Sequence, residues 1–216
     1  MLKGIIFDFD GVIAESVQVK SDAFAELYKS YGQVIVINVV KHHEANGGMS
    51  RYEKIKYYHK SFLKIDLSEK EIIDLADQFS ALVIDKVIVA PYVPGVFEYI
   101  KKCSKKYKLF ISTGTPFEEM RQILEARKIA HYFTDVFGSP QKKPFHVNNI
   151  LSKYNLNPGE LIFYGDSDSD MNAAILNNIQ FILRIHSLNK EYFRYFVGKT
   201  ILDFKDIPED NIRNRR

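Results

Sequence analysis

Short apolar runs alternate with helical patterns along most of this 216-residue chain, and this alternation constrains the fold more than any other feature. The runs that read as strands are residues 3–9, 108–112, 132–137, 160–165 and 178–183, with 199–202 as a possible edge. The helical patterns between them cover 93–107, 116–127, 144–154 and 168–177. Continuous apolar runs are typical of strands buried on both faces, and their alternation with helices predicts an α/β fold with a parallel sheet flanked by helices.

One long stretch, residues 15–89, interrupts this alternation, because it contains several helical patterns and no convincing buried strand. We therefore predict a helical domain at 15–89, inserted into a core that is formed by 1–14 and 90–216. The polar tail after Pro208 is expected to fray.

Helices within the insertion are indicated by their ends. A first helix is expected over 22–31, because Gly32 is a good C-terminal stop. The β-branched run 34–40 fits either a loop or the start of another helix. Helix starts near residues 51 and 69 are predicted by two pairs with capping-box spacing, Ser50 with Glu53 and Ser68 with Glu71.

Composition narrows the classes of function. With 46% hydrophobic and 26% charged residues, the chain is typical of a soluble globular protein. The net charge is only +3 and no sustained basic stripe precedes the short arginine-rich tail, so we expect no nucleic-acid partner. Cys103 is the only cysteine, which excludes an internal disulfide, and no Cys/His spacing resembles a zinc site. No apolar run reaches signal-peptide or membrane-span length, so we expect a cytoplasmic protein without a membrane partner.

Two carboxylates follow the first predicted strand, in the segment Asp8-Phe9-Asp10-Gly11. Ligands of open parallel sheets bind outside the carboxyl ends of the strands. Residues two apart in extended backbone point to the same side, so Asp8 and Asp10 are able to face one pocket, with a solvated turn as the alternative. Gly11 would allow a tight exit and the close approach of a ligand.

Three more carboxylates, Asp166, Asp168 and Asp170, open the helix that follows residues 160–165. Acidic residues are favoured at a helix N-terminus, but capping alone does not require three of them. Such crowding of negative charge is costly without a cation, and a hard divalent ion held by carboxylates, phosphate oxygens and water fits Mg²⁺. The segment lacks the pattern of an EF-hand loop, which disfavours calcium.

Two other strand ends carry groups that suit an anion. Ser112 and Thr113 stand where a strand passes to a helix, and their hydroxyls would either line an anion seat with free backbone amides or simply cap the helix. Lys143 follows another strand candidate, and Pro144 would hold it extended at a helix entrance. An exposed surface lysine is the alternative. None of these four signals is specific by itself, but the order in which they follow one another along the chain is a specific pattern.

An Asp pair, a Ser/Thr, a Lys and an Asp cluster, each after a successive strand, resemble the four signature motifs of the haloacid dehalogenase superfamily. The segments 8–12 and 165–170 are its most specific matches, and the resemblance covers nearly the whole chain. The insertion after the first motif looks like the helical C1 cap of subfamily I. The resemblance implies a Rossmann-like core with a helical cap.

The same resemblance implies a chemistry. Asp8 would be the nucleophile that accepts the phosphoryl group as an aspartyl phosphate. Asp10 would protonate the leaving alkoxide and then activate water, a positioned proton transfer that contributes about 10² to 10⁴ in rate. A carboxylate nucleophile divides one difficult displacement into two easier ones.

The implied ligands follow from the same motifs. Mg²⁺ would be held by Asp8, the backbone carbonyl of Asp10, and Asp166, with Asp170 oriented behind them. Oxygens of the phosphate would be held by Ser112, Thr113 and Lys143.

The residues between the motifs indicate a branch of the family. Dehalogenases of the family lack an acid at the position of Asp10, so a phosphatase is favoured. The mutase β-phosphoglucomutase has a His ten residues after its second Asp, where this chain has Lys20, which disfavours a mutase. The segment 47–51 is similar to the Gly-x-Ser-Arg cap segment of the mutases, so Arg51 would read a second anionic group of the substrate, or would simply be solvated. Lys20 is the other residue of the insertion that we expect as a contact of the substrate.

We therefore expect a Mg²⁺-dependent phosphomonoester hydrolase that acts on a small phosphorylated metabolite. The alternatives are a phosphosugar mutase and a non-enzymatic receiver module phosphorylated on Asp. The sequence leaves the substrate and the oligomeric state open.

Overall fold

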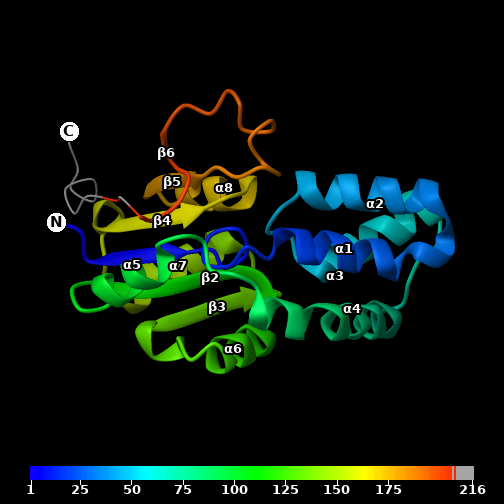
Figure 1. Cartoon of the computed structure of the whole chain (residues 1–216), viewed down its shortest axis with the longest axis horizontal. Coiled ribbons are helices and arrows are strands. Elements are labelled where there is room, and N and C mark those ends of the chain that lie inside the picture. The colour runs from blue at the N-terminus through cyan, green and yellow to red at the C-terminus, as the bar shows by residue number, and fades with distance from the viewer. Residues whose placement is uncertain (206, 208–216) are drawn as a thin grey trace.

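A six-stranded parallel sheet, in the order β3-β2-β1-β4-β5-β6, forms the larger lobe of the computed structural model, which describes residues 1–205 and 207 (Figure 1). The strands are β1 (Gly4–Phe7), β2 (Lys108–Pro116), β3 (Asp135–Ser139), β4 (Leu161–Gly165), β5 (Gln180–Arg184) and β6 (Lys199–Ile201). The predicted parallel α/β fold is thus confirmed. The predicted strand at 132–137 begins late, because a short 3-10 turn, η3 (Ala130–Tyr132), occupies its first residue.

The central strand β1 is buried on both faces, as its apolar run predicts. Ile5 and Phe7 pack with α5 (Val96–Cys103) and α6 (Phe117–Ala126) on one face of the sheet. Ile6 points to the other face, toward α7 (Lys143–Lys153) and α8 (Asp168–Leu176). Neighbouring residues of a strand face opposite sides, so this short segment supplies both halves of the core. A second 3-10 turn, η4 (Pro158–Glu160), leads into β4.

Four helices between β1 and α5 form a second lobe beyond the carboxyl ends of the strands (Figure 1). They are α1 (Val17–Leu27), α2 (Gln33–Ala45), α3 (Arg51–Tyr58) and α4 (Glu69–Val89), with the 3-10 turn η1 (Lys29–Tyr31) after α1 and the π-helical turn η2 (His59–Leu63) after α3. We call this lobe the cap. Its interior is aromatic: Phe24, Tyr28, Tyr58 and Phe79 are almost fully buried.

The helix starts in the cap follow the sequence signals closely. Ser50 and Ser68 cap α3 and α4, each accepting a hydrogen bond from the backbone three residues on, as predicted. The first helix starts earlier than expected, at Val17, and stops before η1 and Gly32. The ambiguous run 34–40 is helical, within α2, because β-branching costs a helix only a few tenths of a kcal/mol per residue, which packing against α1 offsets.

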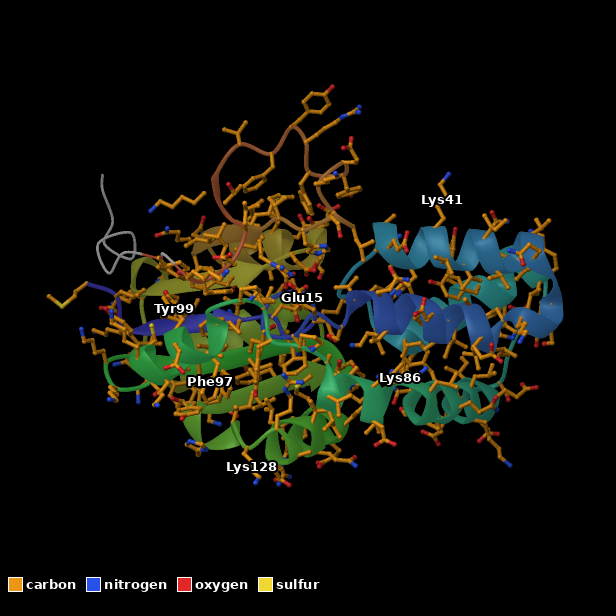
Figure 2. All side chains as sticks on the ribbon, in the orientation of Figure 1. Glu15, Lys41, Lys86, Phe97, Tyr99 and Lys128 are labelled. Carbon is orange, nitrogen blue, oxygen red and sulfur yellow. The ribbon has the colours of Figure 1, made fainter. Side chains whose placement is uncertain are left out.

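The junction of the two lobes is held by charge as well as by the chain itself. Glu15 lies where β1 leads into the cap (Figure 2), and its carboxylate pairs with Arg184 at the end of β5, 2.5 Å away. The same guanidinium donates to the carbonyl of Gly11 at 2.9 Å.

Of the helices in the described ranges, none has the length and apolar character needed to cross a membrane. The tail after Pro208 lies outside the described residues.

Candidate active site

Asp8 is the first residue beyond β1, at the edge of the sheet where the strands' carboxyl ends meet. Its backbone N–H donates to the carbonyl of Tyr164 in β4 at 2.9 Å, which fixes the position of the carboxylate between the two strands. Gly11 has a φ of +75°, and a Cβ at this position would lie 2.0 Å from Oδ2 of Asp166. Only glycine therefore allows the turn after Asp10 to approach the fourth strand this closely.

Lys143, the first residue of α7, joins the first and last acidic motifs. Its Nζ lies 2.6 Å from Oδ2 of Asp8 and 2.7 Å from Oδ1 of Asp170, and all three side chains are buried. Although burial disfavours its charge, the two carboxylates raise the pKa of Lys143 above its ordinary value. The predicted lysine is thus a charged group inside the site rather than a surface residue.

Three carboxylates gather around this lysine. Oxygens of Asp8, Asp166 and Asp170 all lie within 4.8 Å of one another. Burial raises the pKa of Asp8 to about 7, and repulsion from Asp170 adds to the effect while Lys143 opposes it. Burial also raises the pKa values of Asp166 and Asp170. One ammonium does not balance three carboxylates, of which Asp8 and Asp170 are buried and Asp166 is half-buried, so the group is held together at an electrostatic cost.

The donor set fits a hard divalent cation. Mg²⁺ is bound in proteins through one or two carboxylates, with phosphate oxygens and water completing its ligands. A cation would also oppose the burial and the mutual repulsion that raise the pKa values of the three carboxyl groups. Asp8 and Asp166 are therefore carboxylates that would hold such an ion, with Asp170 beside them.

Asp166 has two partners that the sequence did not single out. Nε2 of His186 lies 2.9 Å from its carboxylate, and the side chain of Asn189 donates to its backbone carbonyl at 2.9 Å. Both residues follow β5. Because His186 stands just beyond a strand's carboxyl end, the rule that ligands bind at such ends would have indicated it.

Asp10 lies beside the carboxylate cluster and has its own set of donors. Its carboxylate accepts hydrogen bonds from Ser16, at 2.6 Å, and from the ammonium of Lys20. The same ammonium donates to Oγ1 of Thr115 at 2.8 Å. Burial opposes ionisation of Asp10, but Lys20 and Ser16 together lower its pKa below the ordinary value. Lys20 thus forms an ion pair with Asp10. Thr115 is a further residue of the site, which the sequence analysis did not identify.

The two neighbouring hydroxyls of β2 have different surroundings. Ser112 is fully buried and its Oγ lies 3.0 Å from Nδ1 of His146, on the α7 face of the sheet. Thr113, one residue on, lines a surface pocket that Lys143 also lines. Ser112 follows Ile111, which pairs with Phe7 of β1, so the backbone of Ser112 lies beside Asp8 at the edge of the sheet. The contacts of Ser112 and Thr113 with a phosphate stay predictions.

The loop between α2 and α3 brings the cap onto the catalytic edge of the sheet. Gly48 has a φ of +75°, and a Cβ there would lie 2.0 Å from Oγ of Ser169 and 2.8 Å from Nζ of Lys143. Across the same contact, a Cβ on Gly114 of β2 would lie 2.7 Å from the carbonyl oxygen of Gly48. The glycines thus let the cap backbone close directly over the lysine.

Arg51 is fixed by residues of the protein itself. Its guanidinium forms a bidentate ion pair with Glu119 of α6, at 2.6 and 2.7 Å, and also contacts Ser80 of α4. Arg51 and Glu119 are both buried. The predicted substrate contact lies on the cavity wall, but its planar fork is occupied by a carboxylate from the core.

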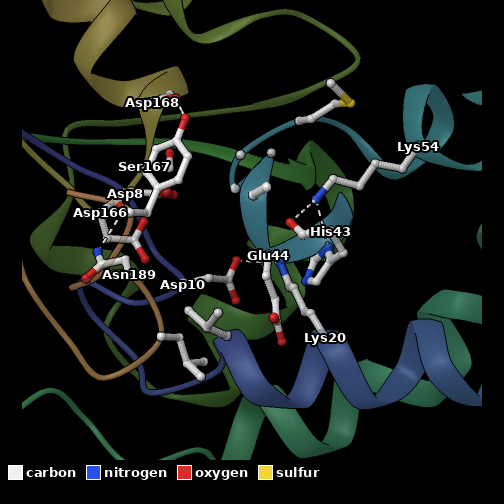
Figure 3. A pocket seen from close by; sticks show the side chains of 18 of the residues that line it. Asp8, Asp10, Lys20, His43, Glu44, Lys54, Asp166, Ser167, Asp168 and Asn189 are labelled. Carbon is white, nitrogen blue, oxygen red and sulfur yellow. Dashed lines mark hydrogen bonds and ion pairs between the residues drawn. The ribbon is translucent and has the colours of Figure 1, made fainter. Parts of the chain in front are cut away.

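A cavity of about 90 Å³ lies between the two lobes and receives side chains from both. Figure 3 shows Asp8, Asp10 and Asp166 on the core side and Lys20, His43 and Lys54 on the cap side. A cavity of this size suits a small molecule whose reacting group lies at Asp8.

Comparisons with known proteins agree with this geometry. A family model described as haloacid dehalogenase-like hydrolase matches residues 5–184. A phosphoglycolate phosphatase of Psychrobacter arcticus is 29% identical over 188 residues, 79% of this chain and 77% of that protein. A phosphorylated carbohydrates phosphatase of Thermotoga maritima is 28% identical over 214 residues, 94% of this chain and 91% of that protein.

The fold is also found among solved structures. A β-phosphoglucomutase from Clostridium difficile superposes with a TM-score of 0.77 at 18% identity, over 98% of this chain and 96% of that chain. At this identity the likeness supports the fold alone. Together with the matching family model and the arrangement of Asp8, Lys143, Asp166 and Asp170, these similarities identify the chain as a member of the haloacid dehalogenase-like hydrolase family, and within it as a phosphatase.

Proposed function

We propose that the protein is a Mg²⁺-dependent phosphomonoester hydrolase that cleaves a small phosphorylated metabolite through an aspartyl phosphate on Asp8. The observation that carries the proposal is the position of Asp8, whose carboxylate is 2.6 Å from Lys143, within the group of carboxylates, and on the wall of the cavity between the lobes. The two relatives named above act, by their names, on phosphoglycolate and on phosphorylated carbohydrates. A small phosphate ester is the common class.

The reaction would take two steps. A carboxylate oxygen of Asp8 attacks phosphorus, the bond between phosphorus and the ester oxygen breaks, and Asp10 gives its proton to the leaving oxygen. Water then attacks the aspartyl phosphate, Asp10 takes the water proton, and phosphate leaves with Asp8 restored. Phosphoryl transfer depends mainly on positioning and charge neutralisation.

The surroundings of each group suit its role. The lowered pKa of Asp10 keeps its carboxylate form dominant in the free protein, which suits the second step. The first step uses the protonated form, so Asp10 would take up a proton when the substrate binds and pass it to the leaving oxygen. Ser112, Thr113 and Lys143 would hold oxygens of the phosphate. Mg²⁺, held by Asp8, Asp166 and the backbone carbonyl of Asp10, with Asp170 behind them, would neutralise charge on the phosphoryl group.

We assign the two lobes separate tasks. The core, residues 1–14 and 90–216, would carry out phosphoryl transfer. The cap, residues 15–89, would exclude water and select the substrate, because the cap supplies Lys20, His43 and Lys54 to the cavity wall. The cap also distinguishes the chain from a receiver module, which has none.

The proposal predicts that hydrolysis of an aryl phosphate depends on Mg²⁺ and is abolished in Asp8→Asn, because an amide is a poor nucleophile toward phosphorus. Release of inorganic phosphate measures this, with Asp22→Asn, an exposed carboxylate of α1, as the control that keeps full activity. An Asp8→Asn variant as fast as the parent would show that Asp8 is not the nucleophile. In a second assay with a sugar phosphate as the substrate, accumulation of an isomeric sugar phosphate in place of free phosphate would show a mutase instead.

A further inference from the structure

Two basic side chains of α3 lie on the cavity wall, and they differ in their partners. Arg51 is neutralised by Glu119. Lys54, one helical turn further along, is only 2% exposed, yet no carboxylate among residues 1–205 forms an ion pair with its ammonium. A buried charge without a counter-charge is unfavourable, and proteins retain such groups mainly where they serve a ligand.

The hydrogen bonds of Lys54 leave part of its ammonium unused. Its Nζ donates to Nδ1 of His43, at 2.8 Å, and to the backbone carbonyl of the same residue, at 3.3 Å. Burial and the neighbouring ammonium hold the pKa of His43 well below its ordinary value, so the ring is a neutral acceptor and not a counter-charge. An ammonium has three N–H donors, and the third has no hydrogen-bond partner in the described part of the chain; its other contact is with the ring of Phe24, whose centroid lies 5.8 Å from Nζ.

The charges around Lys54 are mostly of its own sign. Burial, with repulsion from Lys20 and Lys143, lowers the pKa of Lys54 to about 7, and only Asp10 opposes the shift. Glu44 also lines the cavity, but its side chain is exposed and its Oε1 accepts from Ser21 at 3.3 Å. The cap side of the cavity is therefore electropositive and open to an anion from outside the chain.

We propose that Lys54 binds a carboxylate of the substrate, so that the substrate is a small phosphate ester with a carboxylate close to its phosphate. The inference rests on the proposed function, since it takes the phosphate to lie at Asp8. Figure 3 shows Lys54 across the cavity from Asp8, where the far end of such a molecule would lie.

A carboxylate suits this site better than a second phosphate. The cavity is small, about 90 Å³, and Lys54 offers one free donor. The bidentate fork that favours a phosphate belongs to Arg51, which Glu119 already occupies. The substrate named for the Psychrobacter relative, phosphoglycolate, belongs to the class of carboxylated phosphate esters.

The test compares two esters that differ only at the end facing Lys54. They are phosphoglycolate and 2-hydroxyethyl phosphate, in which a hydroxymethyl group replaces the carboxylate. The parent enzyme should prefer the carboxylate. In Lys54→Met we expect kcat/KM for phosphoglycolate to fall about 10- to 100-fold, mostly through KM, because a charge-assisted hydrogen bond is lost. The kcat/KM for 2-hydroxyethyl phosphate should change less than about threefold, since that ester has no carboxylate to accept such a bond.

Two further variants separate binding from folding. Lys54→Gln keeps a donor for His43 but removes the charge, so this variant should also lose the preference for phosphoglycolate over 2-hydroxyethyl phosphate. Lys56→Met removes an exposed lysine from the same helix and should leave both substrates unaffected. Melting temperatures of all variants establish that each is folded under assay conditions.

The outcomes are distinguishable. Equal losses on both esters in Lys54→Met, or no preference in the parent, would overturn the role of Lys54. Hydrolysis of an aryl phosphate without turnover of phosphoglycolate would overturn the substrate class but keep the proposed function. A parent enzyme that releases no phosphate from any ester with Mg²⁺ present would overturn both.

Discussion

Buried lysines of this protein are stabilised to very different degrees. Lys143 lies between two carboxylates, and its pKa is raised. Lys54 is equally buried but has only a neutral imidazole and a carbonyl as acceptors, and burial with the nearby ammonium groups lowers its pKa to about 7. The first arrangement stabilises a charged group in the fold, whereas the second leaves an unfavourable charge that a ligand would relieve.

This difference makes stability depend on pH in a defined direction. Below pH 7 the folded and unfolded states both keep the Lys54 proton, so the folded state bears the full cost of the buried charge. Between pH 7 and the unfolded value of 10.5, only the unfolded state keeps the proton, so the free energy of unfolding rises with pH.

Lys54→Met should therefore stabilise the free protein at pH 6, on the order of 3 kcal/mol, and by progressively less toward pH 10. Urea unfolding midpoints of the parent and variant at several pH values give this difference, and the titrating groups remote from Lys54 cancel between them. Lys56→Met provides the baseline for removing an exposed lysine. A stability difference that stays constant from pH 6 to pH 10 would contradict the assignment of Lys54 as an uncompensated charge.

The loop after α2 brings the cap against the core. Residues 47 and 48 are both glycine, and Gly48 stands directly over Lys143 and Ser169. The backbone there has a φ that other residues adopt only with strain, and even one methyl group would overlap both side chains. The closeness of cap and lysine is thus a property of this loop sequence.

Gly48→Ala should reduce kcat/KM by about 10- to 100-fold, because the added methyl displaces the lysine that holds the phosphate. Steady-state kinetics with an aryl phosphate and Mg²⁺ measure the effect. The matched control is Gly32→Ala, which has a comparable positive φ of +91° but no atom within 4 Å of the added Cβ. If the two variants lose the same activity, backbone strain and not the contact with Lys143 is the cause.

The two lobes act as one molecule because buried interactions cross between them. Arg51 of the cap and Glu119 of the core are separated by 68 residues and form a buried bidentate pair. Ser80 of α4 donates to the same carboxylate at 2.7 Å, so two cap helices are joined to α6 at one point. This network joins the cap to the core at the wall of the cavity.

Glu119→Gln should lower the free energy of unfolding by roughly 3 to 5 kcal/mol, because it leaves the guanidinium of Arg51 buried without a counter-charge. Denaturant unfolding measures the loss. Glu118→Gln changes the neighbouring, exposed carboxylate, which has only a surface pair with Arg121, and should cost less than about 1 kcal/mol. A loss that is equally small in both variants would mean that the pair does not tie the lobes together.

The sequence by itself determined the features that depend on local pattern. Continuous apolar runs predicted the strands of the parallel sheet, and the pairs at Ser50 and Ser68 predicted where α3 and α4 begin, because burial periodicity and capping act over a few residues. The convergence of Asp8, Lys143, Asp166 and Asp170 was also foreseeable, since the carboxyl ends of parallel strands share one edge.

Only the tertiary structure decided which partner each side chain meets. It turned Ser112 toward His146 and gave Arg51 a carboxylate from α6. It left Lys54 without one, so that the buried cation of the cap that lacks a carboxylate partner is not the residue that the motif resemblance indicated. Such pairings depend on atoms that are tens of residues apart along the chain, and the energy of a charge depends on what surrounds it after packing, which no local pattern contains.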